Sequence, residues 1–461
     1  MISRLPTWLR SDLALVLTAR VVGMAVQMLT FVLLARLATP APFGSYSKTY
    51  SYLLVVIGLS DLGVQALVGR EFAVPELRDW GRRAYWLQAC LAGVTATVAC
   101  VGLALFTTHG AVKALIPWQV FVEIQQACTL ALALAAGHAQ VQVRTILVSR
   151  LPVLVAMLAA SASHVNGYPV LVVYLLTTIA STLTAVLWVL VHLDILKNIG
   201  IPKDWRSILS KSRHFLLSSA SWQVRQLDTA LVGWAANATQ AAFYAVPARL
   251  VGPLRLFDTS LTAVVVPYVR RGEKDRVLKF TKVMAAVVLA MSVGFAVVSV
   301  YLPRLVKVIL GESYLPTVGP LRAMLAATAA LMAANYITAV IQAAGRERFV
   351  GLQGGALAAL FVVLVPLGAH LWAATGAAIA VLIINGLQLV SSLAVARSVF
   401  REFVTSRSTQ PQSATSTEQD GHCAAKAGKP RRASAVADPR LEDGYRDSCG
   451  DPLTRPRRAA Q

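Results

Sequence analysis

The sequence predicts an all-α polytopic membrane protein with about 12 transmembrane helices. The chain has 461 residues, of which 56% are hydrophobic and only 14% are charged, whereas a soluble domain carries about 25% charged residues. Its mean hydropathy is +0.61. Apolar runs long enough for a spanning helix, about 20 residues, recur along most of the chain.

The apolar runs divide into twelve predicted spans. The first is retained as a helix because its apolar stretch is longer than the core of a signal peptide. Arg150 and Pro152 interrupt the fifth run, and Pro320 opens the tenth. The predicted spans lie near 13–35, 49–69, 85–106, 114–137, 145–162, 169–192, 214–235, 243–266, 283–302, 319–343, 350–370 and 377–396.

The basic residues are distributed unevenly between the two sides of these spans. The predicted loops on the side of the N-terminus carry 21 Lys and Arg, and the opposite loops carry five. Because Lys and Arg concentrate in cytoplasmic loops, we expect both termini to be cytoplasmic. The same pattern accounts for most of the formal charge of +21, so nucleic-acid binding is not predicted.

The cytoplasmic stretch 193–213 separates the spans into two groups of six. Tyr46 and Tyr244 occupy similar positions in the two groups, as do Asp61 and Asp258. Six spans is an even number, so the halves have the same orientation and form a parallel repeat. Such repeats indicate alternating access around a central cavity.

Three regions follow from this division. They are an N-terminal six-helix bundle, a C-terminal six-helix bundle and a polar, low-complexity segment that we predict to be a disordered cytoplasmic tail. They cover residues 1–205, 206–402 and 403–461.

Charged residues inside the predicted spans are the candidate functional residues. A charge at the bilayer centre costs about 2.5–3.5 kcal/mol on insertion scales, so such residues face a wet cavity or pair with each other. The arginines are candidates for substrate binding in a cationic lumen: Arg20, Arg225, Arg249 and Arg255. The acids are candidates for ion coupling or internal pairing: Asp61, Glu123, Asp228 and Asp258.

Spacing restricts how these residues can meet. Arg225 and Asp228 are three residues apart, so they can share one helix face as an ion pair that fixes helix packing. Arg255 and Asp258 have the same spacing. Glu123 shares a face with Gln126 and could hold a proton or cation, or form an interhelix salt bridge.

Several kinds of chemistry are not predicted. The five cysteines lack metal-ligand spacing, and the chain contains no GxxxxGK[ST], D-x-D or HExxH motif. The longest outer loop, about 303–318, is short for a sugar polymerase or ligase. We therefore expect no metal, no cofactor and no enzymatic activity.

The stretch LLARLATPAPFGSYSKTYSYLLVVIGLSDLGVQALVGREFA, at 33–73, resembles the opening of polysaccharide (Wzx-type) flippases. These belong to the multidrug/oligosaccharidyl-lipid/polysaccharide (MOP) exporter superfamily. The similar phrases are Leu34–Arg36, Phe43–Tyr46 and Asp61–Gly63, followed in the second half by Asp228, Tyr244 and Pro267. Phe243 stands where the family usually has Gly. The resemblance covers about 10–400.

The resemblance implies a MATE-like, V-shaped fold and a flippase function. Such proteins move a polyprenyl-diphosphate-linked oligosaccharide repeat unit across the bacterial inner membrane, for surface or exopolysaccharide synthesis, through a cationic lumen. It further implies coupling to H⁺ or Na⁺, contact with membrane lipid, and a polysaccharide polymerase and chain-length regulator as partners.

The alternative is a MATE-type cation-coupled drug antiporter. That function would favour acids without nearby arginines, because its substrates are cations. Here Arg225 and Arg255 accompany the acids, which favours the flippase. A lipid II flippase is related but usually carries two further C-terminal spans.

Overall fold

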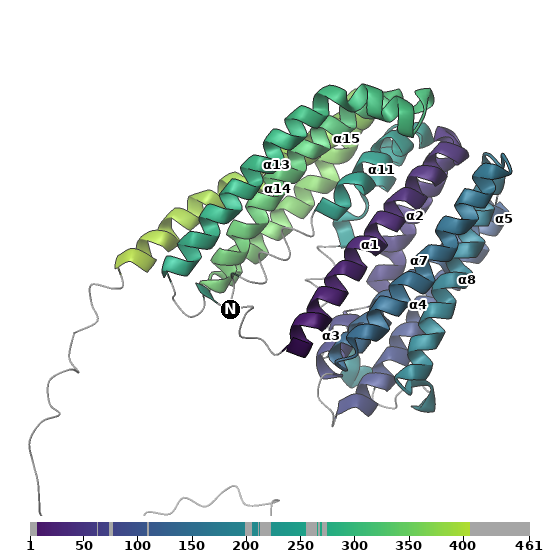
Figure 1. Cartoon of the computed structure of the whole chain (residues 1–461), viewed down its shortest axis with the longest axis horizontal. Helices are drawn as coiled ribbons and strands as arrows, with labels where there is room; N and C mark the ends of the chain where they lie inside the picture. The colour runs from purple at the N-terminus through teal and green to yellow at the C-terminus, as the bar shows by residue number, and fades with distance from the viewer. Residues whose placement is uncertain are drawn as a thin grey trace, which may run out of the picture. The chain divides into compact units, whose positions relative to one another are not determined.

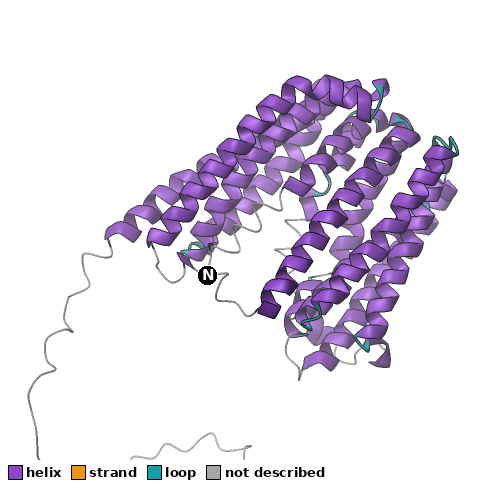
Figure 2. Cartoon of the chain, in the orientation of Figure 1, coloured by secondary structure: helices purple, strands orange, loops and turns teal. Residues whose placement is uncertain are grey.

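The computed structural model describes residues 7–405, except 62, 73–76, 108–109, 199–204, 211, 213–222, 255–264, 266–267 and 270–273. The described part is helical and contains no strand (Figures 1 and 2). The predicted all-α class is thus confirmed. Of the predicted tail, all but the first three residues lies outside the described residues.

The N-terminal half contains long helices joined by short connections. Six of them have at least 21 residues, which suits membrane crossing. The helices are α1 (Thr7–Ala38), α2 (Pro40–Ser60), α3 (Val64–Glu71), α4 (Arg78–Phe106), α5 (Gly110–Lys113), α6 (Leu115–Ala135), α7 (Ala139–Ala162) and α8 (Tyr168–His192), followed by the 3₁₀ helix η3 (Ile195–Asn198).

The described C-terminal half begins with two short helices and continues with three long ones. The long helices lie side by side in Figure 1. The elements are α10 (Asp228–Ala235), α11 (Ala238–Val251), η4 (Gly252–Leu254), α13 (Lys274–Ile309), η5 (Glu312–Thr317), α14 (Val318–Ala343) and α15 (Glu347–Thr405). The seventh and eighth predicted spans include 213–222 and 255–264, which lie outside the described residues.

The helix α15 is two helices joined at a sharp break. Ala373 has φ 51° and ψ −144°, and Trp372 is also non-helical. At the break Gly368 and Gly376 face each other, and a Cβ on either would overlap the carbonyl oxygen of the other. The predicted separation of spans at 350–370 and 377–396 therefore corresponds to this break.

Two sequence predictions of helix bounds were wrong. The second helix begins at Pro40 and ends at Ser60, not at 49 and 69, because proline is well tolerated in the first helical turn and Gly63, with φ 77°, begins a new helix. The predicted span 145–162 begins too late, because α7 begins at Ala139, but its end at Ala162 and its continuation through Pro152 are confirmed.

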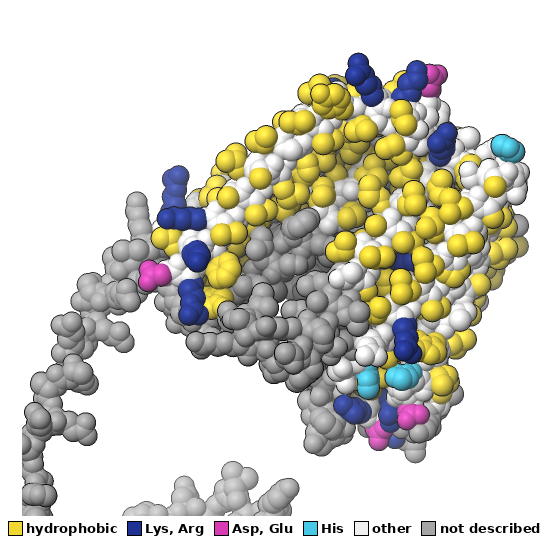
Figure 3. Space-filling view, viewed as in Figure 1, with side chains coloured by type: hydrophobic (Ala, Val, Ile, Leu, Met, Phe, Trp, Pro, Cys, Tyr) yellow, Lys and Arg dark blue, Asp and Glu magenta, His cyan; other side chains and the backbone are white. Residues whose placement is uncertain are grey.

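The molecular surface fits a lipid environment. Seven of the described helical segments are long and apolar enough to cross a membrane. Figure 3 shows hydrophobic side chains covering the faces of α13, α1 and α7, with most of the basic side chains near the helix ends. On α13 the side chains of Val293, Val297 and Val300 are exposed, as expected for lipid contact.

Helices α10 and α11 connect the two groups of long helices. Both pack against α2, and both also contact α15. The largest cluster of buried hydrophobic residues accordingly includes Phe43 and Leu53 of α2, Val246 of α11 and Met324 of α14. This shared core places α10 and α11 beside residues from both halves of the chain.

A close contact between α2 and the α10–α11 region forms what we call the α2–α11 seam, made by Gly44, Lys48, Gly233, Ala238 and Ala242. A Cβ on Gly44 would overlap the carbonyl oxygen of Ala238, so only glycine permits this approach. Lys48 Nζ donates to the carbonyl oxygen of Gly233 at 3.0 Å. The seam lies at the start of α2 and α11, which is the predicted outer end.

Candidate functional site

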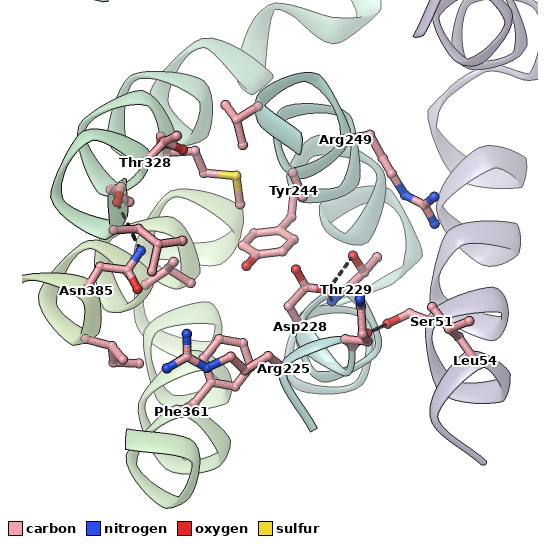
Figure 4. A pocket seen from close by; sticks show the side chains of 18 of the residues that line it. Ser51, Leu54, Arg225, Asp228, Thr229, Tyr244, Arg249, Thr328, Phe361 and Asn385 are labelled. Atoms are coloured by element: carbon pink, nitrogen blue, oxygen red, sulfur yellow. Dashed lines mark hydrogen bonds between the residues drawn. The ribbon is translucent and has the colours of Figure 1, made fainter. Parts of the chain in front are cut away.

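Three cavities that share lining residues contain five of the six predicted site residues that the structure describes. The first, which we call the central pocket, has a volume of about 130 Å³ and lies among α2, α10, α11, α14 and α15. Figure 4 shows Arg225, Asp228, Arg249 and Asn385 around it. Its lining comes from both halves of the chain, as expected of a transport cavity.

Arg225 and Asp228 both line the central pocket but point to different sides of it (Figure 4). Residues 226–227 form a turn between two helical stretches, and the i,i+3 contact of Arg225 with Asp228 stays a prediction. Arg225 Nη2 donates to Gln388 Oε1 of α15 at 3.4 Å. Asp228 Oδ1 accepts from Thr229 N at 2.5 Å, at the start of α10, where a carboxylate is favourable.

The second cavity, the inner pocket, lies mainly between α1, α2, α6 and α8. It is lined by Gln27, Phe31, Tyr46, Tyr50, Gln119, Glu123, Arg150, Tyr174 and Arg249, among others. Tyr50 and Arg249 also line the central pocket, so the two cavities are adjacent and share these residues as a common wall.

Glu123 lies in the inner pocket at the centre of a hydrogen-bond network. Tyr50 Oη donates to Glu123 Oε2 at 2.5 Å, and Gln119 Nε2 donates to Glu123 Oε1 at 3.0 Å. A distance of 2.5 Å is typical of a hydroxyl donating to an ionised carboxylate. In the described part of the chain no Lys or Arg lies within 4.0 Å of Glu123, so the predicted interhelix salt bridge is not formed there.

Arg249 extends from α11 toward α2 (Figure 4). Its guanidinium carbon lies 4.8 Å from the ring centre of Tyr50 and 5.4 Å from that of Phe31, within the range of cation–π attraction. The side chain is nevertheless exposed, because it faces the cavities. Aromatic rings therefore hold this cation while leaving its N–H groups available.

The third cavity, which we call the α1–α7 groove, lies between α1, α6 and α7 and contains Arg20 and Arg150. It shares Gln27 and Arg150 with the inner pocket. With the Gln142 amide oriented to satisfy both groups, its oxygen accepts from Arg20 Nε at 3.3 Å and Nη2 at 2.9 Å. Arg20 therefore lies in this groove, outside the central pocket.

The remaining predicted residues differ in their positions. Asp61 is buried at the end of α2, where its carboxylate accepts from the backbone N–H of Gln65 at 3.1 and 3.2 Å. It lines none of the three cavities, and its carboxylate satisfies a backbone N–H in the first turn of α3, whose N-cap residue is Gly63. Arg255 and Asp258 lie outside the described residues.

Sequence reasoning missed Arg150 as a site residue. We expected it to lie near the inner end of a span that began at 145, but α7 begins at Ala139, which places Arg150 near the middle of the helix. The tyrosines of the inner pocket were also missed. Tyr50 and Glu123 are 73 residues apart, and no local pattern joins them.

The comparisons with known proteins agree with this geometry. A sequence model of a family described as "Polysaccharide biosynthesis protein" matches residues 9–273, which is more than half of the chain. The chain belongs to this polysaccharide biosynthesis protein family. This confirms the predicted resemblance.

Solved structures share the fold of this polysaccharide biosynthesis protein. A multidrug resistance MATE family transporter of the MOP superfamily, in an inward-facing conformation, has a TM-score of 0.65 and 12% identity over 84% of this chain and 96% of its own. The lipid II flippase MurJ, in an inward closed conformation, has a TM-score of 0.59 and 10% identity over 85% and 90%.

A third structure is a MOP superfamily transporter from Pyrococcus furiosus, whose title reports a reverse polarity of the binding pocket. It has a TM-score of 0.53 and 12% identity over 86% of this chain and 96% of its own. No curated protein sequence matches the chain. The chain thus belongs to the polysaccharide biosynthesis protein family and shares the fold of these MOP superfamily structures.

Replacing Tyr50 with Phe tests whether Tyr50 donates its hydrogen bond to a charged or to a neutral carboxyl group of Glu123. The variant keeps the ring beside Arg249 but removes the 2.5 Å hydrogen bond to the carboxylate, which is worth about 1.5–3 kcal/mol when the acceptor is charged. We expect a lower melting temperature of the purified protein. Tyr336→Phe, which removes a 3.0 Å hydroxyl contact with Thr281, should lower it less, and an equal effect would argue that Glu123 is neutral.

Proposed function

We propose that this protein moves a polyprenyl-diphosphate-linked oligosaccharide repeat unit across the bacterial inner membrane, by alternating access, for surface or exopolysaccharide synthesis. The observation that carries the proposal is the charge of the three connected cavities. Among the described residues, their lining contains four arginines and two acids: Arg20, Arg150, Arg225, Arg249, Glu123 and Asp228. A cavity system with this excess of arginine suits an anionic cargo.

The identity of the basic residues supports a phosphate-bearing cargo. In the part of the chain that the structure describes, the cations that line these cavities are arginines, whose planar guanidinium matches phosphate oxygens with two parallel hydrogen bonds. A diphosphate carries several such oxygens. The sugar hydroxyls can use the amide and hydroxyl groups of Asn385, Thr328 and Ser51 in the central pocket.

The proposal also assigns a direction and a coupling group. The excess of Lys and Arg on the N-terminal side makes that side cytoplasmic, so the α2–α11 seam is periplasmic. Glu123 is the proposed group for coupling to H⁺ or Na⁺, because it is an acid next to Arg249 in the same pocket. Cargo and ion would thus act on adjacent side chains.

The MATE-type drug antiporter remains the second candidate because the fold is shared with a multidrug transporter. It would require a site that attracts cations. The arginine excess in the cavities disfavours such a site, and the two functions predict different phenotypes.

Export complementation tests the proposal. Deleting the gene should remove the surface polysaccharide and cause lipid-linked repeat units to accumulate on the cytoplasmic leaflet, and the wild-type gene should restore both. Normal surface glycan with a new sensitivity to cationic drugs would reject the flippase and support the antiporter.

A further inference from the structure

The α1–α7 groove combines two cations with an apolar wall. Arg20 and Arg150 are its charged residues, and most of its other lining is apolar, including Met24, Leu130 and Ile146. A groove of this composition is unusual within a membrane span, since a charge there is costly without a compensating group. This composition suits an anionic lipid, whose charged head group would contact the arginines and whose hydrocarbon chain would contact the apolar wall.

Neither arginine forms a salt bridge within the part of the chain that the structure describes. Among the described residues, neither has a carboxylate within 4.0 Å. Arg20 uses two of its five N–H groups on Gln142. Arg150 has no hydrogen-bond acceptor in the described part of the chain, so both guanidinium groups retain donors for an anion.

The groove is placed where a lipid can reach it. Around it, the side chains of Val21, Leu134, Val148 and Leu151 are exposed, which in a bilayer means exposure to lipid. Figure 3 shows a basic side chain emerging within the hydrophobic face formed by α1 and α7. Access is therefore lateral, from the bilayer.

The depth of the two arginines is fixed by the helices. The backbone N–H of Gly167 donates to the carbonyl oxygen of Leu37 at 2.9 Å, which holds the C-terminal ends of α1 and α7 close together. At 1.5 Å per residue, Arg20 lies about 27 Å from the end of α1 and Arg150 about 18 Å from the end of α7. The cations thus extend from the predicted cytoplasmic side to the middle of the bilayer.

The groove continues into the cavities assigned to transport. Gln27 and Arg150 belong both to the groove and to the inner pocket, and Arg249 belongs to the inner and central pockets. Arginines therefore follow one another from the lipid-facing groove to the central pocket. A site for ordinary phospholipid would not need this continuity.

We propose that the α1–α7 groove is a lateral binding site for the diphosphate end of the lipid-linked cargo. Arg20 and Arg150 bind the phosphate oxygens, and the polyprenyl chain lies against the apolar wall at Met24 and Ile146. The inference rests on the proposed function and adds to it an entry site within the N-terminal half, separate from the central pocket.

The test uses the purified full-length protein and a polyprenyl diphosphate without a glycan, titrated by native mass spectrometry. We expect Arg20→Gln and Arg150→Gln each to weaken binding about tenfold or more, because each removes charge-assisted hydrogen bonds. Arg20→Lys and Arg150→Lys should retain part of the affinity. Arg322→Gln is the matched control, since Arg322 is exposed on α14 and donates to Ser299 O.

Three outcomes would overturn the inference. One is unchanged affinity in the Arg20→Gln/Arg150→Gln double variant when its melting temperature equals that of the wild type. Another is displacement of the probe by phosphatidylglycerol at equal concentration, which would make the groove a general phospholipid site. The third is binding that only Arg225→Gln weakens, which would reject the groove and retain the proposed function.

If the proposed function itself is wrong, both the binding assay and the export assay give a different result. The wild-type protein would then bind no polyprenyl diphosphate, and deletion of the gene would leave the surface glycan unchanged. Since the binding assay and the export assay are independent, the two failures can be distinguished.

Discussion

Gly44→Ala is expected to abolish export while the protein still inserts into the membrane. The added methyl would overlap the carbonyl oxygen of Ala238 and crowd the backbone N–H of Ala242. Neither group belongs to a flexible side chain, so α2 and α11 must separate. Overpacking of this kind costs about 1–3 kcal/mol, which lowers the ratio of closed to open seam by about fivefold to about 150-fold.

Access to the central pocket is the direct measurement of this effect. A single cysteine at Ser51, which lines that pocket, should react faster with a membrane-impermeant maleimide added from the periplasmic side in the Gly44→Ala background. Gly294→Ala is the matched control, because a Cβ at Gly294 meets nothing within 4 Å. Equal labelling in the two glycine variants would mean that the seam does not close the pocket.

Arg249→Gln is expected to reduce export of the lipid-linked glycan at least about tenfold, with normal protein levels. Arg249 is the cation shared by the inner and central pockets, and its loss removes the charge at their junction. Arg249→Lys keeps the charge and the attraction to the rings of Phe31 and Tyr50, but loses the two-pronged hydrogen bonding of guanidinium. It should therefore fall between the wild type and the Gln variant.

Surface glycan and accumulated lipid-linked repeat units, measured together, check this prediction. Arg322→Gln again serves as the control, because it removes an exposed arginine outside the three cavities. If the Arg249→Gln variant exports the lipid-linked glycan as well as the wild type does, the proposal of a cationic path is wrong. If Lys and Gln variants are equally defective, the shape of the guanidinium matters more than its charge.

Hydropathy predicted the fold class because it records which segments can enter a bilayer. It also identified Arg20, Glu123, Arg225 and Arg249 as charges within spans, and all four line the cavities. Hydropathy does not record which side chains are neighbours across helices. The contact of Tyr50 with Glu123 and the position of Arg20 outside the central pocket therefore required the structure.

The helix bounds show a second limit of the sequence pattern. Pro40 and the polar residues after it begin α2, although an apolar run starts only later. Asp61 was expected to serve ion coupling or internal pairing because it lies within a predicted span. Its carboxylate accepts from the backbone N–H of Gln65 in the first turn of α3, and a charge at a helix break has a local use that hydropathy cannot distinguish.

The α2–α11 seam has a consequence for how the chain tolerates amino-acid change. Lys48 donates to a main-chain carbonyl, that of Gly233, and Tyr314 likewise donates to the carbonyl of Ala35 at 2.8 Å. A carbonyl is present whatever the side chain. Substitution is therefore limited in two ways: the positions 48 and 314 need a long donor, whereas Gly44, Gly233 and Ala35 must stay small because they are crowded or fully buried.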